Sequence, residues 1–194
     1  MDMHLKQHWP VQIAQWDAGH LIAPAEKMFE AAEYMPGEYS TWHSPQRTPN
    51  IPESDRFRAV LEVACDQLAG QQGIDLKRYR CIIPPQAMWL NNMGPGDQHE
   101  THVHGGCHYS GTFYLSTPPG CSPIRFHNPM RLLWKYVEYP IEHWGTSPAG
   151  RCVDYQPHPG LLLIWNSWLE HEVTPTAQGG RRGISFNLQL APRS

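Results

Sequence analysis

The chain has 194 residues, of which 17% are charged, and its formal net charge is -3. That length suits a single domain with its own hydrophobic core. Lysine and arginine are dispersed along the sequence rather than clustered, so they form no basic surface for a nucleic-acid backbone or an anionic membrane. We therefore expect neither nucleic acid nor a membrane as a partner.

Cysteine usage and the first residues bear on the compartment. The five cysteines form no CxxC pair and are odd in number, which argues against a disulfide framework and a thiolate zinc site. The segment MDMHLKQHWPVQIAQWD lacks the basic start and apolar run of a signal peptide, and no segment approaches the roughly 20 apolar residues of a membrane span. These features predict a cytoplasmic protein.

The first 80 residues predict helices and loops. The stretch AEKMFEAAEYM after Pro24 is compatible with a helix, and a proline-rich loop ends it because proline cannot donate helix hydrogen bonds. A second helix has Ser54 as its candidate cap and Gly70 near its end. Its apolar residues recur at the spacing of one buried face: Phe57, Val60, Leu61, Ala64 and Leu68. We expect both helices to pack on the outside of a sheet.

From about Arg80 onward, short strand-like runs alternate with Gly, Pro and Asn. The eight runs are QAMWLNNM, ETHVH, YSGTFYLS, IRFHN, LLWKYVEY, CVDYQ, GLLLIWN and RRGISFNLQL. Such runs predict a mainly β fold with flanking N-terminal helices, in which the strands form a double-sheet jelly roll or barrel rather than a parallel sheet. We expect one domain over residues 1–194, with a helical and loop elaboration at 1–80 and a jelly-roll core at 81–192.

Three histidines predict a metal site. His102 and His104 are two residues apart, and residues at that spacing on a strand point to the same face. His171, far along the chain, can close one side of the coordination sphere. Three protein ligands on one face leave the other positions open for small molecules, which is typical of a catalytic metal. The alternative is a pair of half-exposed histidines at a sheet edge.

A carboxylate ligand is the open question at this site. If ETHVH is a strand, Glu100 shares a face with both histidines, while His99 and Val103 lie on the other face. No histidine stands two residues before an Asp or Glu, so the usual HxD or HxE pair is missing. We favour the three histidines as ligands, with Glu100 either an outside candidate or a partner that orients one of the rings.

Several motifs between Trp89 and Leu190 keep a recognisable order and spacing. They are Trp89 and Asn91, His102-x-His104 followed by Ser110-Gly111-Thr112-Phe113-Tyr114, Phe126-His127-Asn128-Pro129, Gly160 to Trp165 with Ser167-Trp168-Leu169 and His171, and Arg181 to Ser185-Phe186-Asn187. In this order the chain resembles the bacterial and phage 2-oxoglutarate and iron(II)-dependent oxygenases. The resemblance implies a double-stranded β-helix, a jelly roll of the cupin-like kind, with Fe(II), 2-oxoglutarate as cosubstrate and O2.

The resemblance also implies roles for single residues. It assigns the three histidines to iron and Arg181 to the distal carboxylate of 2-oxoglutarate. It makes Tyr114 and Asn91 candidate hydrogen-bond partners of the cosubstrate, because each lies on an inward-facing strand of the barrel. For Tyr114 the alternative is core packing with the hydroxyl at the rim. No further side chain is assigned a catalytic role.

The arginine of the cosubstrate clamp has two candidates, Arg181 and Arg182. A guanidinium group can pair with a carboxylate through two hydrogen bonds, and a ten-residue offset lets the next strand return beside His171. Alternation along a strand puts Arg181, Gly183, Ser185 and Asn187 on one face, and Arg182 on the other. We favour Arg181, because the polar face should border the pocket.

The sequence departs from the family's usual pattern at four places. Gly105 stands where the family usually has proline, and Cys107 where it has serine. NPMR replaces a DPR triplet, and Gly183 replaces the serine of an Arg-x-Ser pair. These departures leave the candidate iron ligands intact and bear on the cosubstrate clamp.

The favoured function is that of an oxygenase that hydroxylates, or otherwise oxidises, a C–H bond of a small-molecule substrate. Desaturation and cyclisation need only a different substrate position, so the sequence does not separate them. One alternative is a cupin-type dioxygenase with three histidines and no 2-oxoglutarate. Another is a non-catalytic jelly-roll module whose histidines are structural or hold zinc. The sequence does not decide the oligomeric state, for which a symmetric homodimer is the default.

Overall fold

The computed structural model describes residues 11–32, 48–131, 150–175, 177 and 179–193. Its helices are α1 (Ile22–Ala31), preceded by the 3-10 turn η1 (Gly19–Leu21), and α2 (Pro52–Gln71). The described strands form a larger and a smaller sheet, and all their pairings are antiparallel. None of the described helices has both the length and the apolar composition needed to cross a bilayer.

The larger sheet, called the major sheet below, has the strand order β1-β8-β5-β10-β2, and β3 also pairs with β10. Its strands are β1 (Ile13–Asp17), β2 (Tyr79–Ile82), β3 (Met88–Met93), β5 (Tyr109–Ser116), β8 (Leu161–Asn166) and β10 (Arg181–Pro192). The first half of β10 pairs with β3 and its last residues pair with β2, so this one strand joins both to the sheet.

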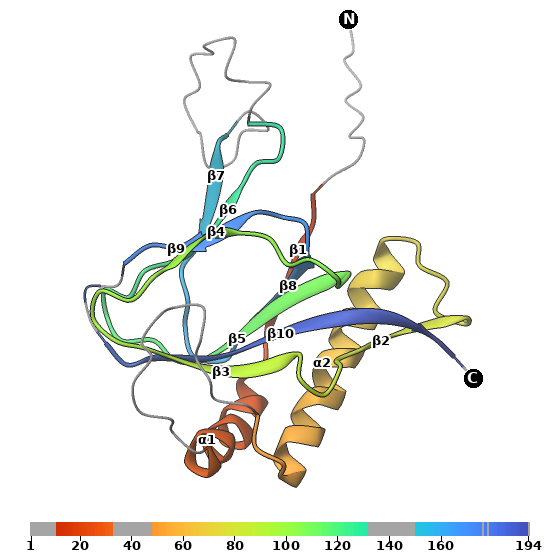
Figure 1. Ribbon diagram of the computed structural model, residues 1–194, viewed down its shortest axis with the longest axis horizontal. Coiled ribbons are helices and arrows are strands. Elements are labelled where there is room, and N and C mark those ends of the chain that lie inside the picture. The colour runs from red at the N-terminus through yellow and green to blue at the C-terminus, as the bar shows by residue number, and fades with distance from the viewer. Residues whose placement is uncertain (1–10, 33–47, 132–149, 176, 178, 194) are drawn as a thin grey trace, which may run out of the picture.

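The smaller sheet, called the minor sheet below, has the strand order β4-β9-β6-β7. Its strands are short: β4 (His99–His102), β6 (Ile124–His127), β7 (Cys152–Tyr155) and β9 (His171–Val173). Figure 1 shows α1 and α2 on the side of the major sheet that is turned away from the minor sheet. The molecule therefore has three layers: helices, major sheet and minor sheet.

Two hydrophobic clusters fill the spaces between these layers. One joins the helices to the major sheet and includes Phe57, Phe113 and Phe186, each fully buried. The other lies on the opposite side of the major sheet and includes Tyr114 and Phe126 from the two sheets. Because successive strand residues point to opposite faces, Phe113 and Tyr114 contribute to different clusters. This explains why β5 and β8 are buried on both faces rather than alternating between buried and exposed residues.

The predicted helices are present, with differences at their starts. The first begins at Ile22, so Pro24 lies in its first turn, where its missing N–H costs no hydrogen bond. The second begins at Pro52, and its N-cap is Ile51. The prediction of Ser54 as the cap is wrong. Ser54 is buried inside the first turn, and its hydroxyl donates instead to the Pro49 carbonyl oxygen at 2.7 Å.

The predicted strands match the described part of the sheets closely, and the facing antiparallel sheets confirm the predicted jelly roll. The run YSGTFYLS coincides with β5, and six other runs contain β3, β4, β6, β7, β8 and β10 or most of each. The run LLWKYVEY lies outside the described residues. Three strands were not predicted: β1 in the supposedly irregular start, β2, and the three-residue β9 that carries His171.

Candidate metal centre

The three predicted ligands come together at one end of the minor sheet. His102 is the last residue of β4 and pairs with His171, the first residue of β9. The prediction that His104 lies on the same strand as His102 is wrong, because β4 ends two residues earlier. A hydrogen bond of 3.0 Å from its backbone nitrogen to the Ser167 carbonyl oxygen ties His104 to the connection between β8 and β9 instead. One nitrogen from each ring lies within 4.8 Å of those of the other two.

Hydrogen bonds to the backbone fix the orientation of two of the rings. Nδ1 of His102 lies 2.6 Å from the Glu100 carbonyl oxygen, and Nδ1 of His171 lies 2.9 Å from the Leu169 carbonyl oxygen. Because a carbonyl oxygen only accepts, each Nδ1 carries the hydrogen. In the neutral ring this leaves the Nε2 lone pair free, which is the arrangement of a histidine prepared to bind a metal.

Burial keeps these imidazoles uncharged. It lowers the pKa of His171 to about 3, with the neighbouring His102 as the next cause. It lowers the pKa of His104 to about 4, and it also lowers the pKa of His102. A metal ion binds the unprotonated ring, so the three side chains are already in the binding form at neutral pH.

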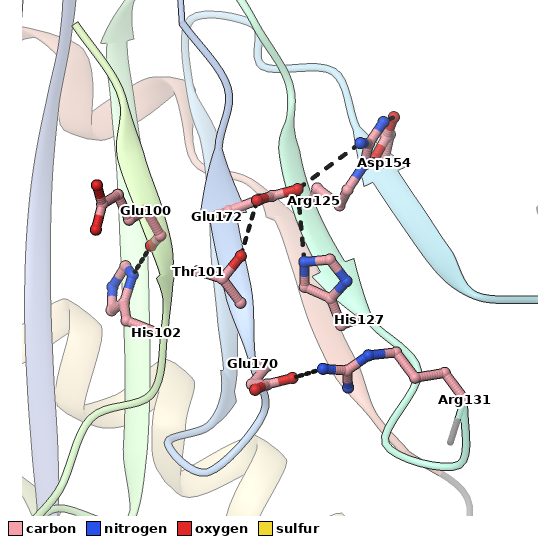
Figure 2. A network of polar contacts seen from close by, with 9 residues as sticks. All are labelled: Glu100, Thr101, His102, Arg125, His127, Arg131, Asp154, Glu170 and Glu172. Carbon is pink, nitrogen blue, oxygen red and sulfur yellow. Dashed lines mark hydrogen bonds and ion pairs between the residues drawn. The ribbon is translucent and has the colours of Figure 1, made fainter. Parts of the chain in front are cut away.

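Glu100 has a different place from the one its sequence position suggested. Glu100 is exposed. Among the described residues, the three histidines form a cluster of potential metal ligands, and Glu100 does not belong to it. Figure 2 shows the Glu100 carbonyl oxygen accepting the hydrogen bond from His102. Of the two roles expected for Glu100, metal ligand or partner that orients a ring, the structure supports the second. Glu100 orients the His102 ring, but through its backbone carbonyl group rather than its carboxylate.

His99 is a pocket residue that the sequence reasoning missed. Regular alternation would turn its side chain away from His102, yet both rings line the same pocket, with their centroids 6.3 Å apart. The cause is an irregularity in the β4–β9 pairing: His99 pairs with Val173 and His102 with His171, so three steps on β4 match two on β9. A bulge of this kind has no signature in ETHVH.

Arg181 lies across the pocket from the histidines, at the start of β10. It is 5% exposed, and its Nη2 donates to the Tyr114 hydroxyl oxygen at 3.1 Å. Its Nη1 is also buried and has no hydrogen-bond partner among the described residues. Burial raises the pKa of Tyr114, although Arg181 opposes the shift, so the phenol stays neutral. The pocket thus holds a buried cation with one unused donor, which a bound anion would satisfy.

Arg182 lies on the opposite face of β10 from Arg181, as strand alternation predicts. Its guanidinium carbon lies 5.4 Å from the centroid of the Phe29 ring of α1, on the helix side of the sheet. Asn91 lines the pocket beside Arg181, and its side-chain nitrogen donates to the Ser185 hydroxyl at 2.7 Å. Asn187, which alternation also placed on the pocket face, instead accepts a hydrogen bond from Ser110.

The remaining pocket wall is largely apolar. The lining residues on the minor-sheet side include Ile124 and Val173, and Trp165 closes the far side with its ring centroid 4.8 Å from that of His171. Three neutral imidazoles suit a divalent metal, and the buried arginine suits the carboxylate of an organic ligand. The residues present therefore fit a metal ion with an anionic cosubstrate beside it.

Comparisons with known proteins agree with this chemistry. A family model described as "Putative 2OG-Fe(II) oxygenase" matches residues 87–187. The structure resembles a Pseudomonas putida prolyl-4-hydroxylase (TM-score 0.54, 16% identity), with 95% of this chain and 89% of that chain covered. It also resembles an oxidoreductase of the 2OG-Fe(II) oxygenase family from Burkholderia pseudomallei (TM-score 0.61, 12% identity), with 91% and 84% covered.

A third similar structure is AviO1 from Streptomyces viridochromogenes, with a TM-score of 0.52, 13% identity, and 92% of this chain and 90% of that chain covered. At these identities the likeness shows a common fold, the double-stranded β-helix. No curated protein has a significant sequence match to this chain.

Proposed function

Because this chain belongs to the 2OG-Fe(II) oxygenase family, whose model spans more than half of it, we propose that its pocket hydroxylates a C–H bond of a small molecule. The family establishes an oxidoreductase that uses Fe(II), 2-oxoglutarate and O2. The proposal adds the residues: His102, His104 and His171 as the iron ligands, and Arg181 as the clamp for the distal carboxylate.

The observation that carries this assignment is the pairing of two unusual features in one pocket. Three histidine nitrogens lie within 4.8 Å of one another. The buried Arg181 faces the same pocket, and its Nη1 is unpaired within the part of the chain that the structure describes. A histidine cluster or a buried arginine by itself would suit many kinds of protein. Together they match a cosubstrate that binds a metal at one end and carries a carboxylate at the other.

The chain's own part in the reaction is binding, orientation and exclusion of water. Iron with 2-oxoglutarate and O2 supplies the oxidising chemistry when bound. The Nδ1–H bonds of His102 and His171 hold the rings with Nε2 toward the metal. Tyr114 accepts from Nη2 of Arg181, which leaves the buried Nη1 available to the carboxylate of the cosubstrate. Apolar walls such as Ile124 lower the local dielectric and strengthen this ion pair.

Asn91 and Tyr114 have supporting roles in this proposal. The Tyr114 hydroxyl remains free to donate to the carboxylate, because its contact with Arg181 uses only an oxygen lone pair. Asn91 donates one amide hydrogen to Ser185 and keeps another hydrogen and its carbonyl oxygen for the ligand. Both residues thus combine burial with unused hydrogen-bonding capacity.

The test is the visible spectrum of the protein loaded anaerobically with Fe(II) and 2-oxoglutarate. Chelated cosubstrate gives a weak metal-to-ligand charge-transfer band, which we expect in the native protein. His171→Ala should abolish the band. Arg181→Ala should weaken 2-oxoglutarate binding by roughly tenfold or more, the effect of losing a hydrogen bond between charged groups. The matched control is Arg182→Ala, which removes a neighbouring guanidinium from the other face of β10 and should leave the band unchanged.

Two other outcomes would change the assignment. If iron binds but no band forms, a three-histidine dioxygenase that does not use 2-oxoglutarate becomes the better account. If no iron binds, the three histidines are not a metal site. With the band established, release of succinate in a screen of small molecules would identify the substrate.

A further inference from the structure

His99 lines the same pocket as the metal ligands and the arginine clamp. The bulge in β4 turns its ring inward beside Val173, while the His102 ring follows next to His171. Its ring centroid is 6.3 Å from that of His102, and His99 is not a member of the three-histidine cluster. His99 is therefore close enough to contact a molecule bound at the metal. It is not placed to bind the metal together with the three ligand histidines.

Arg181 is the charged group that acts most strongly on His99. Burial is the largest cause that lowers the pKa of His99, to about 4, and the positive charge of Arg181 comes next, ahead of the two metal-ligand histidines. His99 lines the same pocket as Arg181. No hydrogen bond of its side chain occurs within the described ranges, so its ring nitrogens are open to a ligand in the pocket.

The strand that carries Arg181 supplies no such group in the adjacent inward position. Gly183 is the next residue of β10 on that face, and a Cβ added there would lie 2.7 Å from the Phe113 carbonyl oxygen. That distance is too short for any side chain without a shift of the backbone. Besides Tyr114 on β5, a further donor to an anion at Arg181 can come from the facing sheet, where His99 lines the same pocket.

We propose that His99 is a positioning residue for the cosubstrate, which donates a hydrogen bond from its imidazole N–H to the distal carboxylate held by Arg181. This inference rests on the proposed function, because it takes 2-oxoglutarate as the ligand. In this arrangement the major sheet contributes the charge of Arg181 and the Tyr114 hydroxyl, and the minor sheet contributes a further neutral donor. The carboxylate is then held from both sides of the pocket, and the keto acid end is aimed at the metal.

The experiment compares two ligands that differ only in the distal carboxylate. Anaerobic titrations of the Fe(II)-loaded protein, read by the charge-transfer band, give dissociation constants for 2-oxoglutarate and for 2-oxopentanoate. His99→Leu should weaken 2-oxoglutarate binding by roughly tenfold and leave 2-oxopentanoate binding unchanged, because only the former has the group that His99 contacts. His99→Asn keeps a donor and should recover most of the loss.

Two controls separate a lost contact from a damaged fold. His158→Leu removes an exposed histidine and should change neither constant. His99→Phe keeps a flat ring of similar shape but no donor, and should behave like His99→Leu. Iron stoichiometry, measured in each variant, should equal that of the native protein.

The outcomes distinguish this inference from the function on which it rests. If the native protein binds 2-oxoglutarate but His99→Leu and His99→Phe bind it equally well, or lose both ligands to the same extent, His99 is only part of the wall. If the native protein itself binds no 2-oxoglutarate in the presence of iron, the proposed function fails and this inference fails with it.

Discussion

The two sheets that enclose the pocket are built in different ways. Strands β5 and β8 of the major sheet are buried on both faces, because helices cover one face and the pocket cluster covers the other. Strands β6 and β9 of the minor sheet alternate between buried and partly exposed residues, so only their inner face is covered. The clamp lies on the doubly buried sheet, whereas two of the three candidate metal ligands lie on the singly buried one.

A polar network takes the place of a second core on the outer face of the minor sheet. Figure 2 shows Glu172 of β9 between Thr101 of β4 and two residues of β6. Its carboxylate accepts from the Thr101 hydroxyl at 2.8 Å, and lies 3.5 Å from Nε2 of His127 and 3.7 Å from Nη1 of Arg125. Arg125 then donates two hydrogen bonds to Asp154 of β7. This one network crosses all four strands that support the metal site.

The two sheets therefore differ in the source of their stability. The major sheet gains its stability from apolar burial, which is large and insensitive to salt. The minor sheet is held outside by charges that are partly exposed, and each such pair contributes little. Substitutions in each sheet can test this contrast.

Among the substitutions, Phe186→Ala in the major sheet should have the largest effect on stability. Phe186 is fully buried in the cluster beneath the helices, and its ring crosses Gly111, where an added Cβ would lie 2.4 Å from the ring. Truncation leaves a cavity that the surrounding strands cannot fill. We expect a loss of about 3–5 kcal/mol in the free energy of unfolding, measured by urea denaturation. A loss below about 1 kcal/mol would contradict the rigid scaffold described here.

Acidification of the metal-free protein should also lower its stability strongly, through the pocket histidines. Their folded pKa values lie below the ordinary value of 6.5, at about 4 for His99 and His104 and about 3 for His171. Below pH 6.5 the unfolded chain therefore binds protons that the folded chain does not. Stability is full above that pH and falls as the pH drops toward 4, by about 1.4 kcal/mol per pH unit for each imidazole still neutral in the fold.

The measurement is a series of urea unfolding curves of metal-free protein between pH 7 and pH 4.5. His171→Gln should show a shallower decline than the native protein, by roughly one proton, because one buried imidazole no longer titrates. His158→Gln, at an exposed position, should show the native slope. Equal slopes in all three proteins would mean that the pocket histidines are not neutral through burial.

The sequence predicted the larger apolar elements well, because their periodicity arises from the same burial that forms them. The run YSGTFYLS and the buried face of α2 are examples. The sequence also predicted that the three histidines come together, because that prediction depends on their spacing and order along the chain and not on the exact ends of the strands. It missed β9, which has three residues and too few positions for a periodic pattern. It could not place His99, since a bulge depends on the partner strand and leaves no local signal.

Glu172→Gln should lower the free energy of unfolding much less than Phe186→Ala does. Its side chain is 22% exposed, and that of Arg125 is 34% exposed, so solvent weakens their attraction. The amide can still accept from Thr101. We expect a loss of about 0.5–1 kcal/mol at low salt, measured by urea denaturation, and a smaller loss at high salt because ions screen exposed pairs. A loss as large as that of Phe186→Ala would show that the network, rather than the apolar inner face, holds the minor sheet.

Arg182→Leu should have the smallest effect, and it tests whether the two faces of β10 act independently. The guanidinium group of Arg182 lies over Phe29 of α1. The side chain of Arg181, the preceding residue of β10, lines the pocket on the other face of the sheet. Loss of a partly exposed cation–π contact should cost about 0.5 kcal/mol of unfolding free energy, and leucine keeps an apolar contact with the ring. The charge-transfer titration should give the native affinity for 2-oxoglutarate. A weakened affinity in this variant would mean that the docking of α1 controls the position of Arg181 through the backbone of β10, and that the scaffold and the site are coupled.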